Sequence, residues 1–230
     1  MKNIIEIKNV SKYYEMGENI VKAIDGISIT IEKGDFVAIM GPSGSGKSTA
    51  MNLVGSLDLA TQGDIFLGGH NIEYLEESET AQLRGKKIGF IFQSFNLIPN
   101  LTAKENIMLP MLFQDINKEE REDRADELLA LVDLTDRAGH YPNQLSGGQQ
   151  QRVAIARALS NNPEVILADE PTGNLDTKTG EKVLRFLDKL NKQGKTIIIV
   201  THDSNLAKKH AKIIYWLKDG KVEKVTKKKF

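Results

Sequence analysis

Residues 35–50 read DFVAIMGPSGSGKSTA, and this stretch decides the fold. It begins with a short apolar run at 35–40, which is typical of a buried strand. The run leads directly into residues 41–48, GPSGSGKS, which fit the pattern G-x-x-x-x-G-K-[ST]. A helix is predicted to follow from about residue 47 to residue 55. A strand, a glycine-rich loop and a helix in this order are the setting in which the pattern binds phosphate.

The chemistry of this phosphate loop (residues 41–48) follows from its residue types. Glycine lets the backbone curl so that its N–H groups point at phosphate oxygens, and the start of the helix adds a positive dipole end. Lys47 is placed to reach the β and γ phosphates of a nucleotide, and the Ser48 hydroxyl to bind Mg²⁺. Chance would produce the pattern in about one chain of this length in a hundred. The loop therefore predicts a nucleotide-binding site.

Outward from the loop, the first 70 residues mix strands around one early helix, and the later half of the chain alternates helices with apolar strands, which is typical of a parallel sheet covered on both faces. Strands are expected at 4–10, 27–31, 63–67, 87–93, 164–168, 196–200, 212–217 and 221–225, the last after a turn at Asp219-Gly220. Later helices are expected at 149–159, 178–192 and 205–210. The helical stretch from about 101 to 136 interrupts this order. It indicates a helical lobe inserted between two parts of an α/β core.

Three polar pairs predict where helices in this lobe begin. Thr102 with Glu105 and Ser146 with Gln149 have the spacing of a capping box, and Asn117 with Glu120 has a similar arrangement. The first of these helices is expected to run to about residue 108, where Pro110 intervenes. The second, charged helix is expected to bury the apolar residues Leu128, Leu129, Leu131 and Val132.

Composition sets limits on function. The chain has 230 residues, 31 basic and 31 acidic side chains and no cysteine. The length indicates one domain, and the missing cysteine excludes disulfides, cysteine-ligated zinc and thiol catalysis. Zero net charge argues against a general electrostatic grip on nucleic acid. Apolar runs of at most about six residues are too short for a membrane helix, and no secretory signal is evident, so a cytoplasmic protein is expected.

The C-terminal segment departs from this balance. Residues 204–230 carry nine lysines against two acidic residues, a local charge of +7. One interpretation is a solvated tail that aids solubility, and the other is attraction to anionic lipid. The first is favoured because basic tails are common.

Two further strands end in polar side chains. Residues 165–170, VILADE, end in Asp169 and Glu170, and His202 follows the apolar run 197–200. Ligands of parallel sheets bind beyond the carboxyl ends of the strands, so these side chains are expected to face the phosphates. Asp169 would then hold Mg²⁺, Glu170 would polarise the attacking water, and His202 would contact the γ-phosphate.

Residues 145–149, LSGGQ, form a second anion site. A capping serine, two glycines that permit close backbone approach and a helix start make this segment suited to phosphate. The chain thus has two phosphate-binding helix starts, at Lys47 and Ser146, but one pair of catalytic carboxylates. A dimer resolves this mismatch, because the second helix start can then close over the nucleotide of a partner chain.

From residue 4 to about residue 223 the chain resembles the ATP-binding cassette (ABC) ATPases. Residues 41–49 resemble the Walker A loop, 145–149 the signature, 165–170 the Walker B strand and 174–176 the D-loop. The resemblance implies that Lys47, Glu170 and His202 are catalytic and that Ser48, Gln93 and Asp169 bind Mg²⁺. An aromatic residue stacks on adenine, for which Tyr14 is a better match than Tyr13. The resemblance implies nucleotide contacts from Tyr14, Gly41, Ser43, Gly44, Ser45, Gly46, Lys47, Ser48, Thr49, Gln93, Ser146, Gly147, Gly148, Gln149 and Asp176.

The resemblance also implies a fold. It is an α/β phosphate-loop NTPase core with a mostly parallel sheet, an antiparallel β subdomain and an inserted helical subdomain that carries the signature. The expected bounds are 1–93 and 161–230 for the core with its antiparallel part, and 94–160 for the helical subdomain.

Three segments, 12–18, 96–110 and 168–176, are similar to the lipoprotein-release and macrolide-export class. The family implies a Mg²⁺-dependent ATPase that forms a homodimer with ATP and powers a permease, expected here to be a separate subunit. The chain is therefore expected at the inner face of the cell membrane, held there only through the permease. The substrate would be a lipoprotein, a peptide or a drug.

Other functions within the family are compared with this one. A divisome-type ATPase that regulates a cell-wall hydrolase is one. A mechanical ABC protein acting on nucleic acid is another, but only 98 residues separate Lys47 from Leu145, without sustained heptads. Translation-associated relatives carry two cassettes, whereas this chain has one. No nucleic-acid partner is therefore expected.

Overall fold

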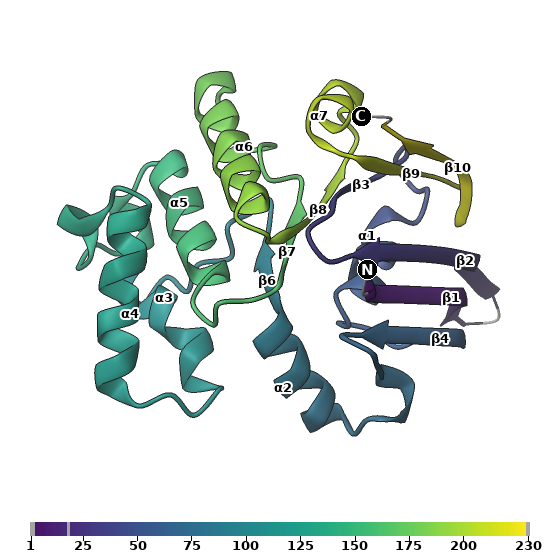
Figure 1. Ribbon diagram of the computed structural model, residues 1–230, viewed down its shortest axis with the longest axis horizontal. Helices are drawn as coiled ribbons and strands as arrows, with labels where there is room; N and C mark the ends of the chain where they lie inside the picture. The colour runs from purple at the N-terminus through teal and green to yellow at the C-terminus, as the bar shows by residue number, and fades with distance from the viewer. Residues whose placement is uncertain (1–2, 18, 229–230) are drawn as a thin grey trace. The chain divides into compact units, whose positions relative to one another are not determined.

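The computed structural model describes residues 3–17 and 19–228 (Figure 1). The chain folds as two compact units. The first comprises the chain up to Arg84 and again from Leu190, and the second runs from Gly85 to Lys189. The segment expected as a helical subdomain, 94–160, lies wholly within the second unit. Each unit contains part of an α/β fold.

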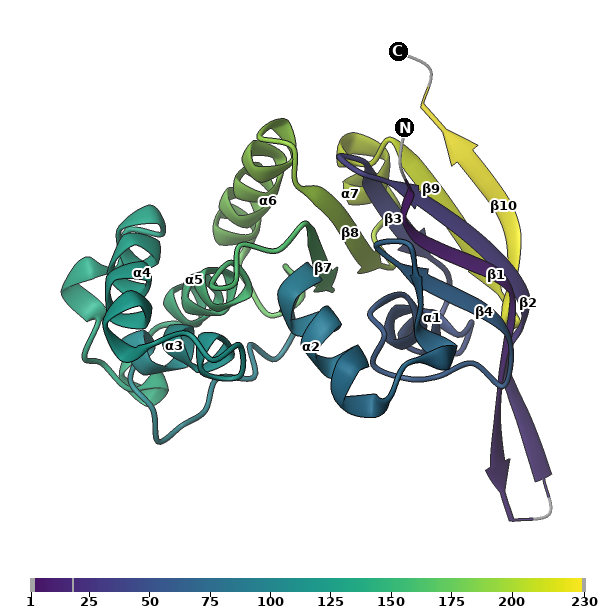
Figure 2. The ribbon, with the colours of Figure 1, turned by 60° about the horizontal axis from the view of Figure 1, so that its bottom comes forward.

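The first unit contains an antiparallel sheet with the strand order β2-β1-β4-β5. Its strands are β1 (Asn3–Met16), β2 (Asn19–Glu32), β4 (Gln62–Leu67) and β5 (His70–Asn71). Alternating isoleucines such as Ile5, Ile7 and Ile29 face the core and are almost fully buried. Strands β1 and β2 are longer than the sequence predicts, because β1 beyond Ser11 pairs with β2 alone. Figure 2 shows this hairpin extending beyond β4.

The same unit contains a second, mostly parallel set of strands in the order β10-β9-β3-β8. Strands β3 (Phe36–Met40), β8 (Thr196–Thr201) and β9 (Ile213–Lys218) run parallel, and every residue of β3 and β8 is buried. Strand β10 (Lys221–Lys227) returns antiparallel after a turn in which Asp219 and Gly220 have φ of 48° and 73°. This turn confirms the prediction at Asp219-Gly220. Helices α1 (Lys47–Val54) and α7 (Ser204–His210) complete the unit.

The second unit contains the parallel strands β6 (Ile88–Ile91) and β7 (Val165–Asp169) and most of the helices. Helix α3 (Ala103–Leu112) packs on both α4 (Lys118–Leu131) and α5 (Gly147–Ala158). Helix α6 (Thr177–Lys192) lies mostly in this unit, and the first unit resumes at its residue Leu190. Short 3-10 turns of this unit lie at η2 (Thr135–Arg137) and η3 (Pro142–Gln144), whereas η1 (Ile72–Tyr74) belongs to the first unit. The parallel strands, the antiparallel sheet and the helices confirm the predicted fold class.

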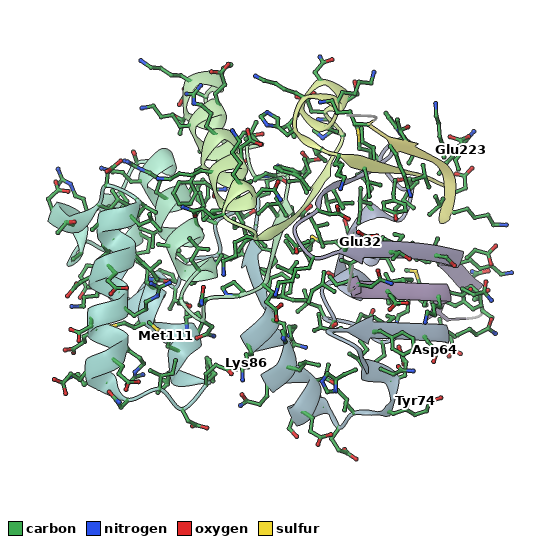
Figure 3. The ribbon with its side chains drawn as sticks, viewed as in Figure 1. Glu32, Asp64, Tyr74, Lys86, Met111 and Glu223 are labelled. Carbon is green, nitrogen blue, oxygen red and sulfur yellow. The ribbon has the colours of Figure 1, made fainter. Side chains whose placement is uncertain are left out.

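Three details correct the sequence predictions. Helix α3 continues through Pro110 to Leu112, because Ile107 and Met111 are buried and hold the last turn. Met111 is labelled in Figure 3. Leu131 was expected to be buried but is 45% exposed, since it lies at the very end of α4. Helix α2 (Glu77–Lys87) was not predicted. Its only buried residue is Thr80, so it has no apolar pattern to detect.

Candidate nucleotide-binding site

The phosphate loop lies between β3 and α1 in the first unit, as the sequence predicts. Gly44 and Gly46 have φ of 76° and 94°, in the left-handed region that favours glycine. A Cβ at Gly46 would lie 2.5 Å from the Ala23 carbonyl oxygen, and one at Gly41 would lie 2.3 Å from the Leu217 carbonyl oxygen. The loop is therefore curled against neighbouring backbone so closely that only glycine fits at these two positions.

The start of α1 is left open to an anion. Its N-cap, Gly46, has no side chain to accept a hydrogen bond, and the first turn has no acidic residue. The first N–H groups of a helix lack intrahelical partners, and together with the helix dipole they favour a bound anion. The Lys47 Nζ donates to the Pro42 carbonyl oxygen of the loop itself at 2.8 Å. The Ser45 hydroxyl is buried without a hydrogen-bond partner. These groups fit a phosphate held in the loop.

The two candidate adenine-stacking tyrosines have different surroundings. The Tyr14 hydroxyl donates to Asp58 Oδ2 at 2.9 Å, and the Tyr13 hydroxyl donates to Asp25 Oδ1 at 3.3 Å. Burial raises the pKa of Tyr14, the neighbouring Asp58 carboxylate raises it further, and a hydrogen bond with Thr49 acts in the opposite direction. Tyr14, on β1, therefore lies beside Thr49 in the first turn of α1, next to the phosphate loop. This position favours Tyr14 as the stacking residue.

His202 lies close to the phosphate loop in the same unit. Strands β3 and β8 are parallel neighbours in which Met40 pairs with Thr201, so Gly41 and His202 leave the same edge of the sheet. His202, Gly41 and Pro42 also line one cavity of about 250 Å³. The structure thus places this histidine beside Gly41 and Pro42 of the phosphate loop.

The carboxylate pair and Gln93 belong to the second unit. Strands β6 and β7 are parallel, with Ile91 paired to Ala168, so Gln93, Asp169 and Glu170 leave the same edge of the sheet. Glu170 has φ of 41°, which is uncommon for a residue with a side chain. The Gly173 N–H donates to the Glu170 carbonyl oxygen at 2.9 Å and closes this turn. Strain of this kind is often found at functional positions.

The D-loop (residues 174–176) follows immediately and touches Gln93. The Asn174 side-chain amide donates to the Gln93 carbonyl oxygen at 2.9 Å. A Cβ at Gly173 would lie 2.8 Å from Gln93 Nε2, so the Gly173 backbone and the Gln93 side chain approach closely. Asp176 accepts hydrogen bonds from the N–H and hydroxyl of Thr179, which lower the pKa of its carboxyl group. Its carboxylate thus fixes the first turn of α6.

The signature (residues 145–149) forms the start of α5 and contains the capping box that the sequence predicts. The Gln149 N–H donates to the Ser146 hydroxyl at 3.3 Å, and the Ser146 N–H donates to Gln149 Oε1 at 2.8 Å. The N–H groups of Gly147 and Gly148 lie in the first turn and lack intrahelical partners. Two backbone donors therefore remain for an anion at this second helix start.

Ser48, Gln93 and Asp169 offer a hydroxyl, an amide and a carboxylate oxygen, which are the ligands that Mg²⁺ prefers. Within residues 3–17 and 19–228, no three His, Asp or Glu side chains gather into a metal-binding cluster. Each of the three side chains by itself therefore carries an oxygen donor of the kind that suits a hard cation.

Comparison with known proteins decides the family. A sequence profile described as "ABC transporter" matches residues 24–173. The uncharacterized ABC transporter ATP-binding protein MJ0796 of Methanocaldococcus jannaschii is 54% identical over 229 residues, which is 97% of each chain. This chain belongs to the ABC transporter family. It is an ABC ATPase.

A solved structure of MJ0796 and a macrolide export protein are also similar to this ABC ATPase. A solved dimeric structure of MJ0796 in a post-hydrolysis state, bound to ADP and Pi, has a TM-score of 0.90 and 51% identity, covering 98% of this chain and 100% of that one. The macrolide export ATP-binding/permease protein MacB of Mannheimia succiniciproducens is 51% identical over 98% of this chain. This chain spans 35% of the length of that MacB. No helix in the described part of this ABC ATPase is long and apolar enough to cross a membrane.

Sequence reasoning missed Arg157, on α5 of this ABC ATPase. Its guanidinium donates to the carbonyl oxygens of Phe95 and Asn96, the first at 2.7 Å. Both residues follow Gln93 and have positive φ, so Arg157 holds a strained segment in place. Burial lowers the pKa of Arg157. Nothing in a sequence pattern marks which arginine will bind backbone carbonyls far along the chain.

Proposed function

We propose that this chain is the ATP-hydrolysing subunit of an ABC transporter, and that two copies close on two ATP molecules to drive a separate membrane permease. The observation that carries this proposal is that two helices begin with backbone N–H groups that have no partner within the helix. Helix α1 and helix α5 both leave backbone N–H groups for an anion, whereas the chain has a single Asp169–Glu170 pair. The dimeric structures of MJ0796 support the same arrangement.

The residues of the phosphate loop are proposed to bind the triphosphate. The N–H groups at the start of α1 and the Lys47 ammonium would hold the phosphates, and Tyr14 would stack on the base. Lys47 is available for this role because its present partner is a neutral loop carbonyl, which a phosphate oxygen replaces with a stronger, charge-assisted bond. Ser43, Gly44, Ser45 and Thr49 are proposed to add contacts from the loop and the first turn.

Hydrolysis is proposed to depend on the groups at the ends of the strands. Ser48, Gln93 and Asp169 would hold Mg²⁺, which when bound neutralises charge on the phosphate oxygens. Glu170 would accept a proton from the attacking water. His202 would donate a hydrogen bond to the γ-phosphate. These roles use only oxygen and nitrogen groups that the family resemblance assigns.

The signature is proposed to bind the γ-phosphate held by a second copy, through Ser146 and the N–H groups of Gly147 and Gly148, with Gln149 holding the cap and Asp176 beside them. This contact gives a physical reason for ATP-dependent dimerisation. The γ-phosphate supplies the negative charge that the start of α5 favours, and hydrolysis removes it from the loop.

The permease is proposed to dock on the second unit, between Gln93 and Leu112. This segment exposes Ile98 and Leu112, at 39% and 48%, and Phe113 beyond it is 65% exposed. Exposed apolar side chains of this kind suit a protein partner. Membrane contact would then be indirect, at the inner face of the cell membrane. The transporter's task is proposed to be export or release of a drug, a lipoprotein or a peptide, and the similarity to a macrolide export protein supports the first of these.

Size-exclusion chromatography with ATP tests the shared site. Glu170→Gln removes the charge that polarises water and lowers the repulsion near the phosphates, so an ATP-bound dimer should accumulate. Adding Ser146→Arg places a bulky side chain where the signature backbone must approach the phosphate. The double variant should bind ATP yet remain monomeric. If both variants dimerise equally, the shared site is wrong.

A further inference from the structure

Thr179 lies between the D-loop and the signature in the second unit, and both of its polar groups are used by Asp176. Its N–H donates to Asp176 Oδ1 at 3.0 Å, and its hydroxyl donates to Asp176 Oδ2 at 2.5 Å. Because the same carboxylate holds the backbone and the side chain of Thr179, this side chain has one orientation. Asp176 therefore determines where the Thr179 methyl group points.

That methyl group rests on the signature backbone. A Cβ at Gly148 would lie 2.8 Å from Thr179 Cγ2, and the three atoms nearest to that position all belong to Thr179. Helices α5 and α6 lie next to each other in Figures 1 and 2. Gly148 and Thr179 also line one cavity of about 410 Å³. Since open space borders the contact, Thr179 is the main support that Gly148 has on this side.

The segment that contains Asp176 is also held at its other end. Gly173 packs against the Gln93 side chain, and Asn174 donates to the Gln93 carbonyl oxygen. Residues 173–179 thus touch Gln93 at one end and Gly148 at the other. A continuous series of contacts therefore joins two segments for which the sequence gives no direct link.

We propose that Thr179 is a positioning residue that transmits the position of segment 173–179, and with it that of Gln93, to the signature backbone at Gly148. The inference rests on the proposed function, in which the Gly148 N–H binds the phosphate of a second copy. A displacement of about 1 Å in such a donor is enough to cost about a hundredfold in rate. The Thr179 methyl group, whose orientation is fixed by Asp176, would keep the Gly148 N–H in place.

Two substitutions separate the two contacts of Thr179. Thr179→Ser keeps the hydroxyl bonded to Asp176 but removes the methyl group that rests on Gly148. Thr179→Val keeps a methyl group but removes the hydroxyl that orients it. The matched controls are Thr177→Ser and Thr177→Val, which make the same changes at an exposed threonine two residues earlier.

Hydrogen exchange in the nucleotide-free full chain measures the effect on the signature without requiring a dimer. Both Thr179 variants should raise the exchange rate of the hydrogen-bonded amides of Gln149 and Gln150, which donate to the Ser146 hydroxyl and carbonyl oxygen, by about threefold or more, and both Thr177 variants should leave it unchanged. An unchanged rate in the Thr179 variants would overturn the inference. An equal rise throughout β7 and α6 would also overturn it, because that result reports general loss of stability.

The dimer assay then separates this inference from the proposed function. In the Glu170→Gln background, Thr179→Ser should leave binding of a fluorescent ATP analogue to the monomer unchanged and weaken the ATP-dependent dimer about tenfold. If exchange rises but dimer affinity stays the same, the signature position does not limit assembly and the inference fails. If the Glu170→Gln parent itself never dimerises, the shared site fails, while the exchange result still decides the role of Thr179.

Discussion

Helices α1 and α5 begin in different ways, although both leave backbone donors for phosphate. The start of α1 has glycine at its N-cap in the left-handed region and no side-chain cap, and Lys47 lies beside it. The start of α5 is closed by the Ser146–Gln149 capping box, so only the donors of Gly147 and Gly148 remain. The first start is thus built to bind a nucleotide by itself. The second has fewer donors and no lysine within the signature itself, so we expect it to add binding energy only when a phosphate is brought to it.

The largest expected difference between the two starts lies in the affinity of the monomer for ATP. Lys47→Ala should abolish binding or turnover, a loss of about a hundredfold or more, because the charged donor to the transferred phosphate is gone. Ser146→Arg should leave monomer affinity within about twofold, since the signature is proposed to contact only the nucleotide of a second copy. Titration calorimetry with a nonhydrolysable analogue of ATP measures both. Full hydrolysis by Lys47→Ala would remove the assigned role of the loop.

Alanine substitutions at the two glycines should separate the starts by stability. Gly46→Ala forces a Cβ to 2.5 Å from the Ala23 carbonyl oxygen at φ of 94°, which should cost about 2–4 kcal/mol of unfolding free energy. Gly147→Ala places its Cβ at 3.8 Å from the Phe95 ring, within ordinary contact distance, and should stabilise α5 by about 0.5 kcal/mol. Urea unfolding of both variants checks the signs, and equal losses would contradict this account of the loop.

A smaller effect is expected from the cap that only α5 has. Ser146→Ala removes the acceptor for the Gln149 N–H and should lower the unfolding free energy by about 1 kcal/mol. Ser146→Asp keeps an acceptor at the N-cap and serves as the matched control, which should retain wild-type stability. The midpoint of urea unfolding reports the change. A loss of the same size in Ser146→Asp would show that the cap is not its origin.

The smallest expected effect is on the pH dependence of thermal stability. Helix α3 has a capping box whose second member is Glu105, and hydrogen bonds from the Thr102 backbone and hydroxyl lower the pKa of this carboxyl group. Its contribution to stability is present above the ordinary glutamate pKa and is lost as pH falls through the lowered value. Gln149 in α5 does not titrate. Glu105→Gln should therefore flatten the pH dependence of thermal unfolding between about pH 5 and 3, whereas Gln149→Glu should steepen it. Parallel curves for all three proteins would contradict this interpretation.

Both helix starts could be predicted from the sequence, whereas some other elements of the fold could not. Both motifs and all three capped helices were predictable, because glycine, lysine and short polar residues act within a few positions of each other. The adjacency of Gly41 and His202 followed from parallel strands that end at one edge. Helix α2 was not predictable because it buries almost nothing, and the turn through Pro110 depends on packing by Met111.

Contacts across long stretches of chain were invisible for a different reason. Arg157 binds the carbonyl oxygens of Phe95 and Asn96, and Thr179 packs on Gly148, so each contact depends on the tertiary path of the backbone. The residue types involved are common at solvated surfaces as well. Only the folded structure distinguishes these positioning side chains from ordinary helix residues.

Mixing two inactive variants tests the shared site most directly. Lys47→Ala disables the nucleotide loop and Ser146→Arg disables the signature, so homodimers of either variant have no intact site. A mixed dimer, however, pairs the intact loop of one chain with the intact signature of the other. Equal mixing should restore ATP hydrolysis to about a quarter of the wild-type rate, since half of the random encounters pair unlike chains and each such pair has one working site. Activity that stays at the level of the separate variants would show that loop and signature act within one chain, and would contradict the account.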